Sequence, residues 1–282
     1  MSEPSFGRGA VETIGRGVQA APALRRGIGV TLLLALIGAA GRVVIPVLVQ
    51  QAIDKGFRGG VVRVHTIVVL AAIALVYGSL LAFRAPDLRG VVAYSSIAQM
   101  SFVVLGVFLL SQQGATGATF QMVNHALVSA ALFLCVGVVY DRMHTREIAF
   151  YGGLTSKMPW FAAIFLMFTM ANVGLPGTSG FIGEVLTMTG AYRASTWAAL
   201  IAASGVIFSA VYALTLYRAV MFGEMTNPKL QSITDIDKRE LLLFVPLIVG
   251  TLWLGVYPGA VLDYTGPAVE ALTNAYRVAI GG

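Results

Sequence analysis

The sequence predicts an all-α polytopic membrane protein with about seven transmembrane helices, one of them interrupted. Of its 282 residues, 57% are hydrophobic and 11% are charged, whereas about a quarter of the residues in soluble domains are charged. A helix needs about 20 apolar residues to cross a hydrocarbon core roughly 30 Å thick. Apolar runs of sufficient length lie at about 28–50, 64–84, 92–111, 118–140, 158–194, 197–218 and 241–258.

The net charge of +6 is a topology signal rather than a sign of a nucleic-acid partner. Cytoplasmic loops of membrane proteins carry an excess of Lys and Arg. With the N-terminus inside, thirteen Lys and Arg lie on the inner side and five on the outer side, and Arg42 is the remaining one of the 19. This predicts a multi-pass protein in contact with the lipid bilayer, with a cytoplasmic N-terminus and an outer C-terminus.

The run 158–194 is too long for one straight span, because 37 residues of helix would extend about 55 Å at 1.5 Å per residue. Proline removes a backbone donor, and glycine tolerates backbone angles that other residues resist. The motif "GLPG" supplies both, through Gly174, Pro176 and Gly177. We therefore expect a helix break at Leu175–Gly177, with Thr178 and Ser179 as candidate caps of the second half. Broken helices in transporters often form substrate or ion sites.

Few ionisable residues fall well inside the apolar runs, namely Arg42, His125 and Glu184. A charge at the bilayer centre costs about 2.5 kcal/mol or more, so such residues usually face a cavity or a partner. A carboxyl beside a helix break and an imidazole on a nearby span could pass protons, which makes Glu184 and His125 the candidate proton path. The alternative is structural: a neutral carboxyl that joins two helices and a packed histidine.

Other polar residues in these spans could order water along such a path. They are Tyr94, Ser95, Gln99, Asn124 and Ser129. The same side chains could instead form ordinary hydrogen bonds between membrane helices.

The sequence lacks the motifs of several catalytic classes. It has no glycine-rich phosphate loop with a lysine, no paired-cysteine motif and no histidine spacing suited to zinc or haem. The single cysteine, Cys135, excludes an internal disulfide. We therefore expect no redox chemistry, no metal and no cofactor in this chain.

Four stretches carry a resemblance to a known family: "PDLRGVVAYSSIAQMSFVVLG", "FQMVNHALVSAALFLCVGVVYDRMHTREIAFYGGL", "GLPGTSGFIGE" and "VYALTLYRAVMFGE". From about residue 70 to the end, the chain resembles the antiporter-like subunit M of proton-translocating NADH:quinone oxidoreductase, complex I, and more distantly Mrp-type cation/proton antiporter subunits. The resemblance implies a five-helix repeat with an interrupted helix, Glu184 as a proton carrier and His125 as a relay. It also implies a location in the bacterial inner membrane, other membrane subunits as partners and no cofactor in this subunit.

The chain departs from the family pattern in two ways. Family members are about 500 residues long and have a first repeat with lysines at membrane depth, whereas the four lysines here lie in loops, at Lys55, Lys157, Lys229 and Lys238. The family also tends to have histidine at the position of Gln99, whose amide does not titrate.

Three segments follow from this interpretation. Residues 1–62 would contain one helix outside the family, since 24–57 resembles the first helix of an ABC exporter. Residues 63–222 would form the five-helix repeat, and 223–282 an inner loop, a final span and an outer tail. The leading function is a truncated subunit M-like protein of respiratory complex I that contributes to proton translocation. The alternatives are an Mrp-like antiporter component and an inert fusion fragment lacking the first half-channel.

Overall fold

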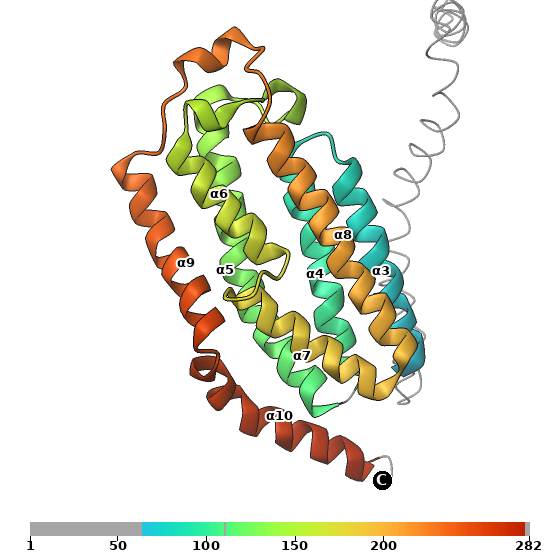
Figure 1. Cartoon of the computed structure of the whole chain (residues 1–282). Coiled ribbons are helices and arrows are strands. Elements are labelled where there is room, and N and C mark those ends of the chain that lie inside the picture. Colours follow the sequence, from blue (N-terminus) through green and yellow to red (C-terminus); the bar gives the residue numbers. More distant parts are fainter. Residues whose placement is uncertain (1–63, 110, 280–282) are drawn as a thin grey trace, which may run out of the picture. The chain divides into compact units, whose positions relative to one another are not determined.

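The computed structural model describes residues 64–109 and 111–279, which belong to one compact unit, Leu48–Gly282. The expected span at 28–50, Arg42 and the segment 1–62 lie outside the described residues. In the described part, the secondary structure is helical, in long apolar helices and short 3-10 turns. Five of these helices are long and apolar enough to cross a membrane (Figure 1). The prediction of an all-α membrane protein is confirmed.

Five helical segments precede the connection to α9 (Lys238–Val256), and one of them is split into two helices. In chain order they are α3 (Val64–Arg84), α4 (Leu88–Phe108), α5 (Gln112–Met143), α6 (Pro159–Asn172) with α7 (Ser179–Ala194), and α8 (Thr196–Met221). The bounds lie within a few residues of the expected spans. As predicted, the run 158–194 is interrupted, and the break occupies residues 173–178.

Local sequence accounts for the starts of α4 and α5. The side chain of Asp87 accepts a hydrogen bond from the amide of Gly90 at 2.7 Å, and that of Ser111 accepts one from the amide of Gly114 at 3.1 Å. Both satisfy amide groups that the first turn of a helix leaves unpaired.

The helices α5 and α7 approach closely because glycines face each other across their contact. A Cβ atom at Gly117 would lie 2.7 Å from the Cβ atom of Leu186, and one at Gly190 would overlap the backbone of Gly114. Small residues at such positions let membrane helices pack by direct backbone contact. This contact holds α7 against α5 and thereby sets the depth of the residues on α7.

Replacing Gly117 by Ala is expected to reduce the free energy of unfolding by about 1–3 kcal/mol, because the added methyl group overpacks the α5–α7 contact. Gly137 lies on the same helix, and a methyl group added to it would meet no atom within 4 Å, so Gly137→Ala serves as the matched control. That control should leave stability unchanged or raise it by up to about 1 kcal/mol. Unfolding in mixed detergent micelles measures both, and equal effects would contradict the close contact.

A residue far along the chain caps the first half of the interrupted helix. The local N-cap position of α6, Met158, provides no side-chain hydrogen bond. Instead, the carboxylate of Asp235 accepts hydrogen bonds from the amides of Trp160, at 2.9 Å, and Phe161, at 3.0 Å. Arg142 at the end of α5 holds the same loop, through the carbonyls of Thr234 and Asp235 and a two-point ion pair of 2.7 Å with Glu240.

Asp235→Ala is expected to lower the free energy of unfolding by about 1 kcal/mol, as for other lost helix caps. Asp263→Ala is a matched control, because Asp263 is an exposed acid on the last helix. Thermal unfolding followed by circular dichroism measures the difference. If the two variants unfolded at the same temperature, the cap would contribute nothing to stability.

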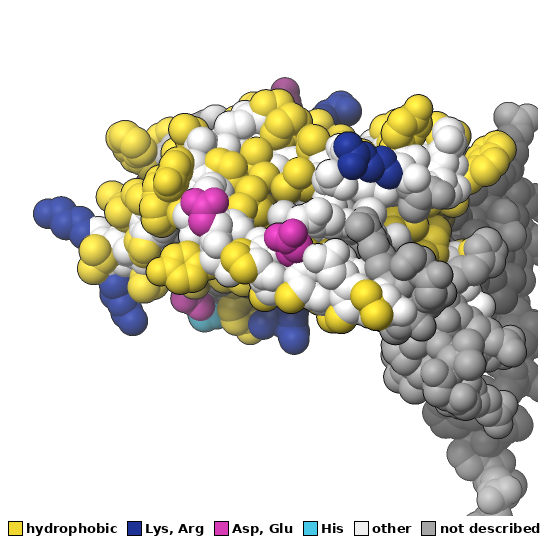
Figure 2. All heavy atoms as spheres, turned by 90° about the horizontal axis from the view of Figure 1, so that it is seen from below, with side chains coloured by type: hydrophobic (Ala, Val, Ile, Leu, Met, Phe, Trp, Pro, Cys, Tyr) yellow, Lys and Arg dark blue, Asp and Glu magenta, His cyan; other side chains and the backbone are white. Residues whose placement is uncertain are grey.

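Two further helices follow α8. The helix α9 (Lys238–Val256) is the last expected span, and a close approach between Gly255 and the backbone of Gly177 places it against the break. The helix α10 (Gly259–Ala279) lies in the segment that was expected to be an outer tail, and it forms although Gly266 and Pro267 disfavour a helix. It packs on α5 and buries Val269 and Thr273, one turn apart. Its exposed residues lie at the end of the molecule seen from below, where apolar side chains surround acidic ones (Figure 2).

Candidate functional site

The carboxyl group of Glu184 lies inside the bundle, on the second turn of α7. Its residue is 2% exposed. Its position follows from the helix break, because α7 begins anew at Ser179 and turns the Glu184 side chain toward α4 and the end of α6. The Nε2 atom of Gln99, on α4, donates a hydrogen bond to Oε1 of Glu184 at 3.1 Å.

The second carboxyl oxygen of Glu184 faces the break. A Cβ atom at Gly174 would overlap Oε2 of Glu184, and Gly174 has a φ of 82°. Glycine is therefore required at this position for two reasons: the left-handed backbone and the space for the carboxyl group. Gly177 has a φ of 92° but no atom within 4 Å of a Cβ position, so its requirement is for backbone angle alone.

The predicted caps of the second half-helix do not act as caps. Thr178 occupies the N-cap position, but its hydroxyl donates to the carbonyl of Leu175 at 2.7 Å. The hydroxyl of Ser179 donates to Oδ1 of Asn124 at 2.6 Å. Both expectations about capping were wrong, since neither hydroxyl oxygen accepts a hydrogen bond from an amide in the first turn of α7.

Buried amide side chains connect α7 back to Glu184 through α5 and α4. Asn124 donates to Oε1 of Gln121 at 3.3 Å, Gln121 donates to Oε1 of Gln99 at 2.9 Å, and Gln99 donates to Glu184. Gln99 also donates to the carbonyl of Asn172, the last residue of α6, at 2.9 Å. Through this one side chain, α4 contacts both halves of the interrupted helix.

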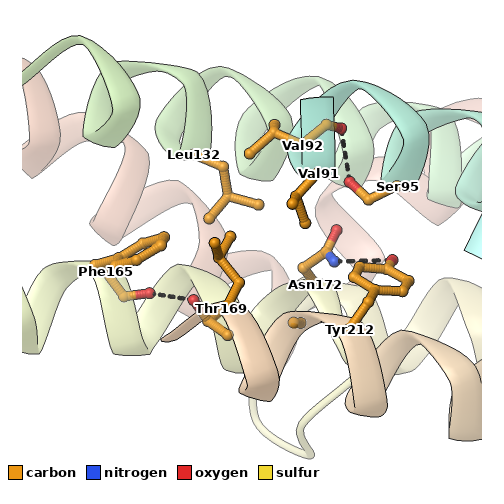
Figure 3. Close-up of a pocket in the computed structure, with 10 residues that line it drawn as sticks. Val91, Val92, Ser95, Leu132, Phe165, Thr169, Asn172 and Tyr212 are labelled. Atoms are coloured by element: carbon orange, nitrogen blue, oxygen red, sulfur yellow. Dashed lines mark hydrogen bonds between the residues drawn. The ribbon is translucent and has the colours of Figure 1, made fainter. Parts of the chain in front are cut away.

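A small cavity lies on the other side of Asn172 (Figure 3). Its polar lining comes from Ser95, Thr169, Asn172 and Tyr212, and Nδ2 of Asn172 lies 3.3 Å from the hydroxyl oxygen of Tyr212, to which it donates. Its volume of ≈ 20 Å³ is enough for one water molecule, which needs about 10–15 Å³. Figure 3 shows that the hydroxyl groups of Ser95 and Thr169 are bonded to carbonyls of their own helices.

The structure brings some predicted site residues together and leaves others apart. Gln99 and Asn124 join Glu184 in one network, and Ser95 lines the cavity. The hydroxyl oxygen of Ser129 lies 3.5 Å from that of Ser96. The contact between Ser96 and Ser129 joins α4 to α5. Tyr94 packs beside the apolar core.

His125 follows Asn124 on α5, and its side chain is partly buried. Within residues 64–109 and 111–279, no hydrogen bond joins it to Glu184 or to the amide side chains. The pairing of His125 with Glu184 therefore stays a prediction.

Sequence reasoning missed Asn172 as part of the site. It is a hydrogen-bonding residue within an apolar run, which is the signal that could have identified it. In the described part of the chain, no group of three or more His, Cys, Asp or Glu residues is arranged to hold a metal ion.

The fold and this site define a class of protein: a polytopic helical membrane protein in which a broken helix holds a buried carboxyl group against polar neighbours. Residues 27–209 match the family described as "NADH:quinone oxidoreductase/Mrp antiporter, TM". The chain belongs to this family.

Individual relatives agree with the family match. NADH-quinone oxidoreductase subunit M of Rhodobacter capsulatus is 55% identical over 213 residues, which are 76% of this chain and 42% of the relative. The solved respiratory complex I from Thermus thermophilus contains a similar chain, with a TM-score of 0.70 and 36% identity over 75% of this chain and 44% of that one. A chain of the Mrp complex from Dietzia sp. shares the fold, with a TM-score of 0.67 and 24% identity over 76% of this chain and 48% of that one.

These matches also show how much of the relatives the chain covers and where the family match begins. The chain spans about two fifths of the length of the curated relatives it matches. The family match begins at residue 27, so it includes most of the segment 24–57 that was compared with an exporter helix and starts earlier than the expected residue 70.

Proposed function

We propose that this chain translocates protons as a membrane subunit of a complex I-type NADH:quinone oxidoreductase, with Glu184 as the group that takes up and releases the proton. The observation that carries this proposal is the carboxyl group itself, buried beside a helix break. Uncompensated charge at this depth costs about 2.5 kcal/mol or more, and such side chains in membrane proteins usually belong to ion pathways.

The surroundings of Glu184 support a carrier rather than a permanent ion pair. The salt bridge found among the described residues joins Arg142 to Glu240 at 2.7 Å, far along the chain from Glu184. Glu184 instead accepts one hydrogen bond from a neutral amide. A carboxyl group with neutral neighbours can change its protonation state without leaving a buried cation unpaired.

The distribution of basic residues supports a cytoplasmic position for one end of the bundle. The ends of α3, α5 and α8 meet the starts of α4, α6 and α9, as contacts between Asp87 and Glu147 and between Thr155 and Met221 indicate. Basic residues gather in these segments: Arg84, Arg89, Arg142, Arg146, Lys157, Arg218, Lys229, Lys238 and Arg239. By the positive-inside rule, this end lies on the cytoplasmic side of a bacterial inner membrane. The N-terminus is then inside and the C-terminus outside.

Proteoliposomes containing the full chain test the function directly. Under a potassium diffusion potential, they should take up protons faster than protein-free vesicles. Sodium-dependent exchange without a redox partner would instead identify an Mrp-like component. Uptake equal to that of protein-free vesicles would identify an inert fragment and overturn the proposal.

Partnership requires a second experiment. Expressed in its bacterial membrane, the tagged chain should copurify with membrane subunits of complex I, and NADH-driven proton uptake should fall when the chain is removed. Copurification with antiporter subunits alone would contradict this assignment.

His125→Ala is expected to slow proton uptake about tenfold. This effect is smaller than that expected of a Glu184 substitution, because water can replace a lost relay group. The matched control is His144→Ala, at the left-handed end of α5 outside the apolar core. Uptake is measured in the same vesicles. An unchanged rate in His125→Ala would assign His125 a structural role.

A further inference from the structure

We infer that Gln99 is a positioning residue for Glu184, and that the carboxamide chain behind it, from Gln99 through Gln121 to Asn124, carries no protons to the carboxyl group. In consequence, Glu184 takes up and releases its proton through Oε2, on the side of the helix break. This inference rests on the proposed function, since it specifies which oxygen of the proposed carrier reacts and from which side.

The orientation of each amide in the chain is determined by its neighbours. The carbonyl of Asn172 can only accept, so the Gln99 group beside it must be Nε2, which also reaches Glu184. Oε1 of Gln99 then faces Gln121, which must donate through its own Nε2 at 2.9 Å. The same reasoning continues to Asn124, whose Oδ1 accepts from the hydroxyl of Ser179.

The hydrogen bonds that link successive side chains of this series, from Ser179 through the three amides, therefore all point toward Glu184. A chain that conducts protons must reverse its hydrogen bonds after each transfer, which a water or a hydroxyl group does by rotating. A carboxamide has different atoms at its two ends and neither gains nor loses a proton in water near neutral pH. Rotating Gln99 would place its oxygen against two acceptors, the Asn172 carbonyl and the Glu184 carboxyl group.

The two oxygens of Glu184 are consequently unequal. Oε1 is occupied by the N–H group of Gln99, so it serves as the carbonyl oxygen when the acid is protonated. Oε2 lies against Gly174 at the break, and no described residue donates a hydrogen bond to it. The proton binds to Oε2. The amide side chains hold the carboxyl group in position and do not carry protons to it.

Infrared spectroscopy of the full chain in phosphatidylethanolamine–phosphatidylglycerol vesicles tests the positioning role. The C=O stretching band of protonated Glu184 is the band that disappears in Glu184→Gln. Gln99→Leu should shift this band to higher frequency, because a C=O group that loses a hydrogen bond vibrates faster. Gln99→His, which retains a ring N–H donor, should restore the frequency, and Ser101→Ala is the control, since Ser101 on α4 bonds only to its own helix.

An unshifted band in a folded Gln99→Leu variant would place the proton elsewhere and overturn the inference while leaving the carrier role intact. If the wild-type chain has no band that depends on Glu184 at any pH, the proposed function itself fails. The two failures are therefore distinguishable.

A second variant tests whether the amide side chains carry protons, and it does not alter Gln99. Gln121→Leu interrupts the series of hydrogen-bonded amides. The exchange of the Glu184 proton after transfer into D2O should keep its wild-type rate. Exchange slowed by about 100-fold or more, the lower range for loss of a proton-transfer group, would show that protons travel through the amide side and would overturn the inference.

Discussion

Glu184→Gln is expected to reduce proton uptake by proteoliposomes at least about 100-fold, the lower range for loss of an acid–base group, which brings it close to that of protein-free vesicles. The amide oxygen of glutamine can still accept the hydrogen bond from Gln99 that Oε1 of Glu184 accepts in the wild type. The substitution therefore preserves the size of the side chain and its main contact, and removes only the ability to titrate.

Folding must be shown to survive this substitution. The free energy of unfolding of Glu184→Gln should stay within about 1 kcal/mol of wild type, because the replacement removes no packing volume. Glu270→Gln is the matched control, since Glu270 is an exposed acid on α10, and it should conduct at the wild-type rate. Full uptake by a folded Glu184→Gln variant would exclude Glu184 as the carrier.

Gly174→Ala is expected to abolish most proton uptake and to destabilise the fold. The new methyl group would occupy the space of Oε2 of Glu184, and an L-residue in the left-handed region costs about 1–2 kcal/mol. The carboxyl group must move away from the break or the two half-helices must separate. Either change removes the geometry in which Glu184 exchanges its proton.

Gly177→Ala separates these two effects, because Gly177 has a similar φ but open space around it. Gly177→Ala should lose about 1–2 kcal/mol of stability from backbone strain, Gly174→Ala should lose more because of the added overlap with Glu184, and only Gly174→Ala should lose proton uptake. The measurements are detergent unfolding and the vesicle assay. Equal losses of uptake would show that backbone strain, rather than contact with the carboxyl group, explains the effect.

The sequence was sufficient to predict most helices in the described part of the fold. Apolar runs located the spans within a few residues, because the thickness of the bilayer imposes a length that composition reveals directly. The break was predictable from Pro176 and its flanking glycines, since their effects on a helix are local. The helix α10 was missed because its propensity is poor, and contacts with α5 outweigh that propensity.

The site was only partly predictable. Burial of Glu184 followed from its place in an apolar run, and Gln99 and Asn124 were recognised as polar residues that could lie beside it. Which atoms donate and which accept depends on distances between α4, α5 and α6, and these are tertiary facts. The role of Gly174 likewise needed coordinates, because a glycine that makes a turn and a glycine that makes room for a carboxyl group look alike in sequence.

The cap on α6 has a consequence for biosynthesis. The amide of Trp160 is satisfied by a carboxylate 75 residues further along the chain, so the ribosome releases the first half of the split helix long before its cap. During that interval the half-helix enters the translocon while the first amides of the helix lack the hydrogen bonds to Asp235. The first half of the interrupted helix is therefore capped late, once the loop before α9 has emerged and folded back.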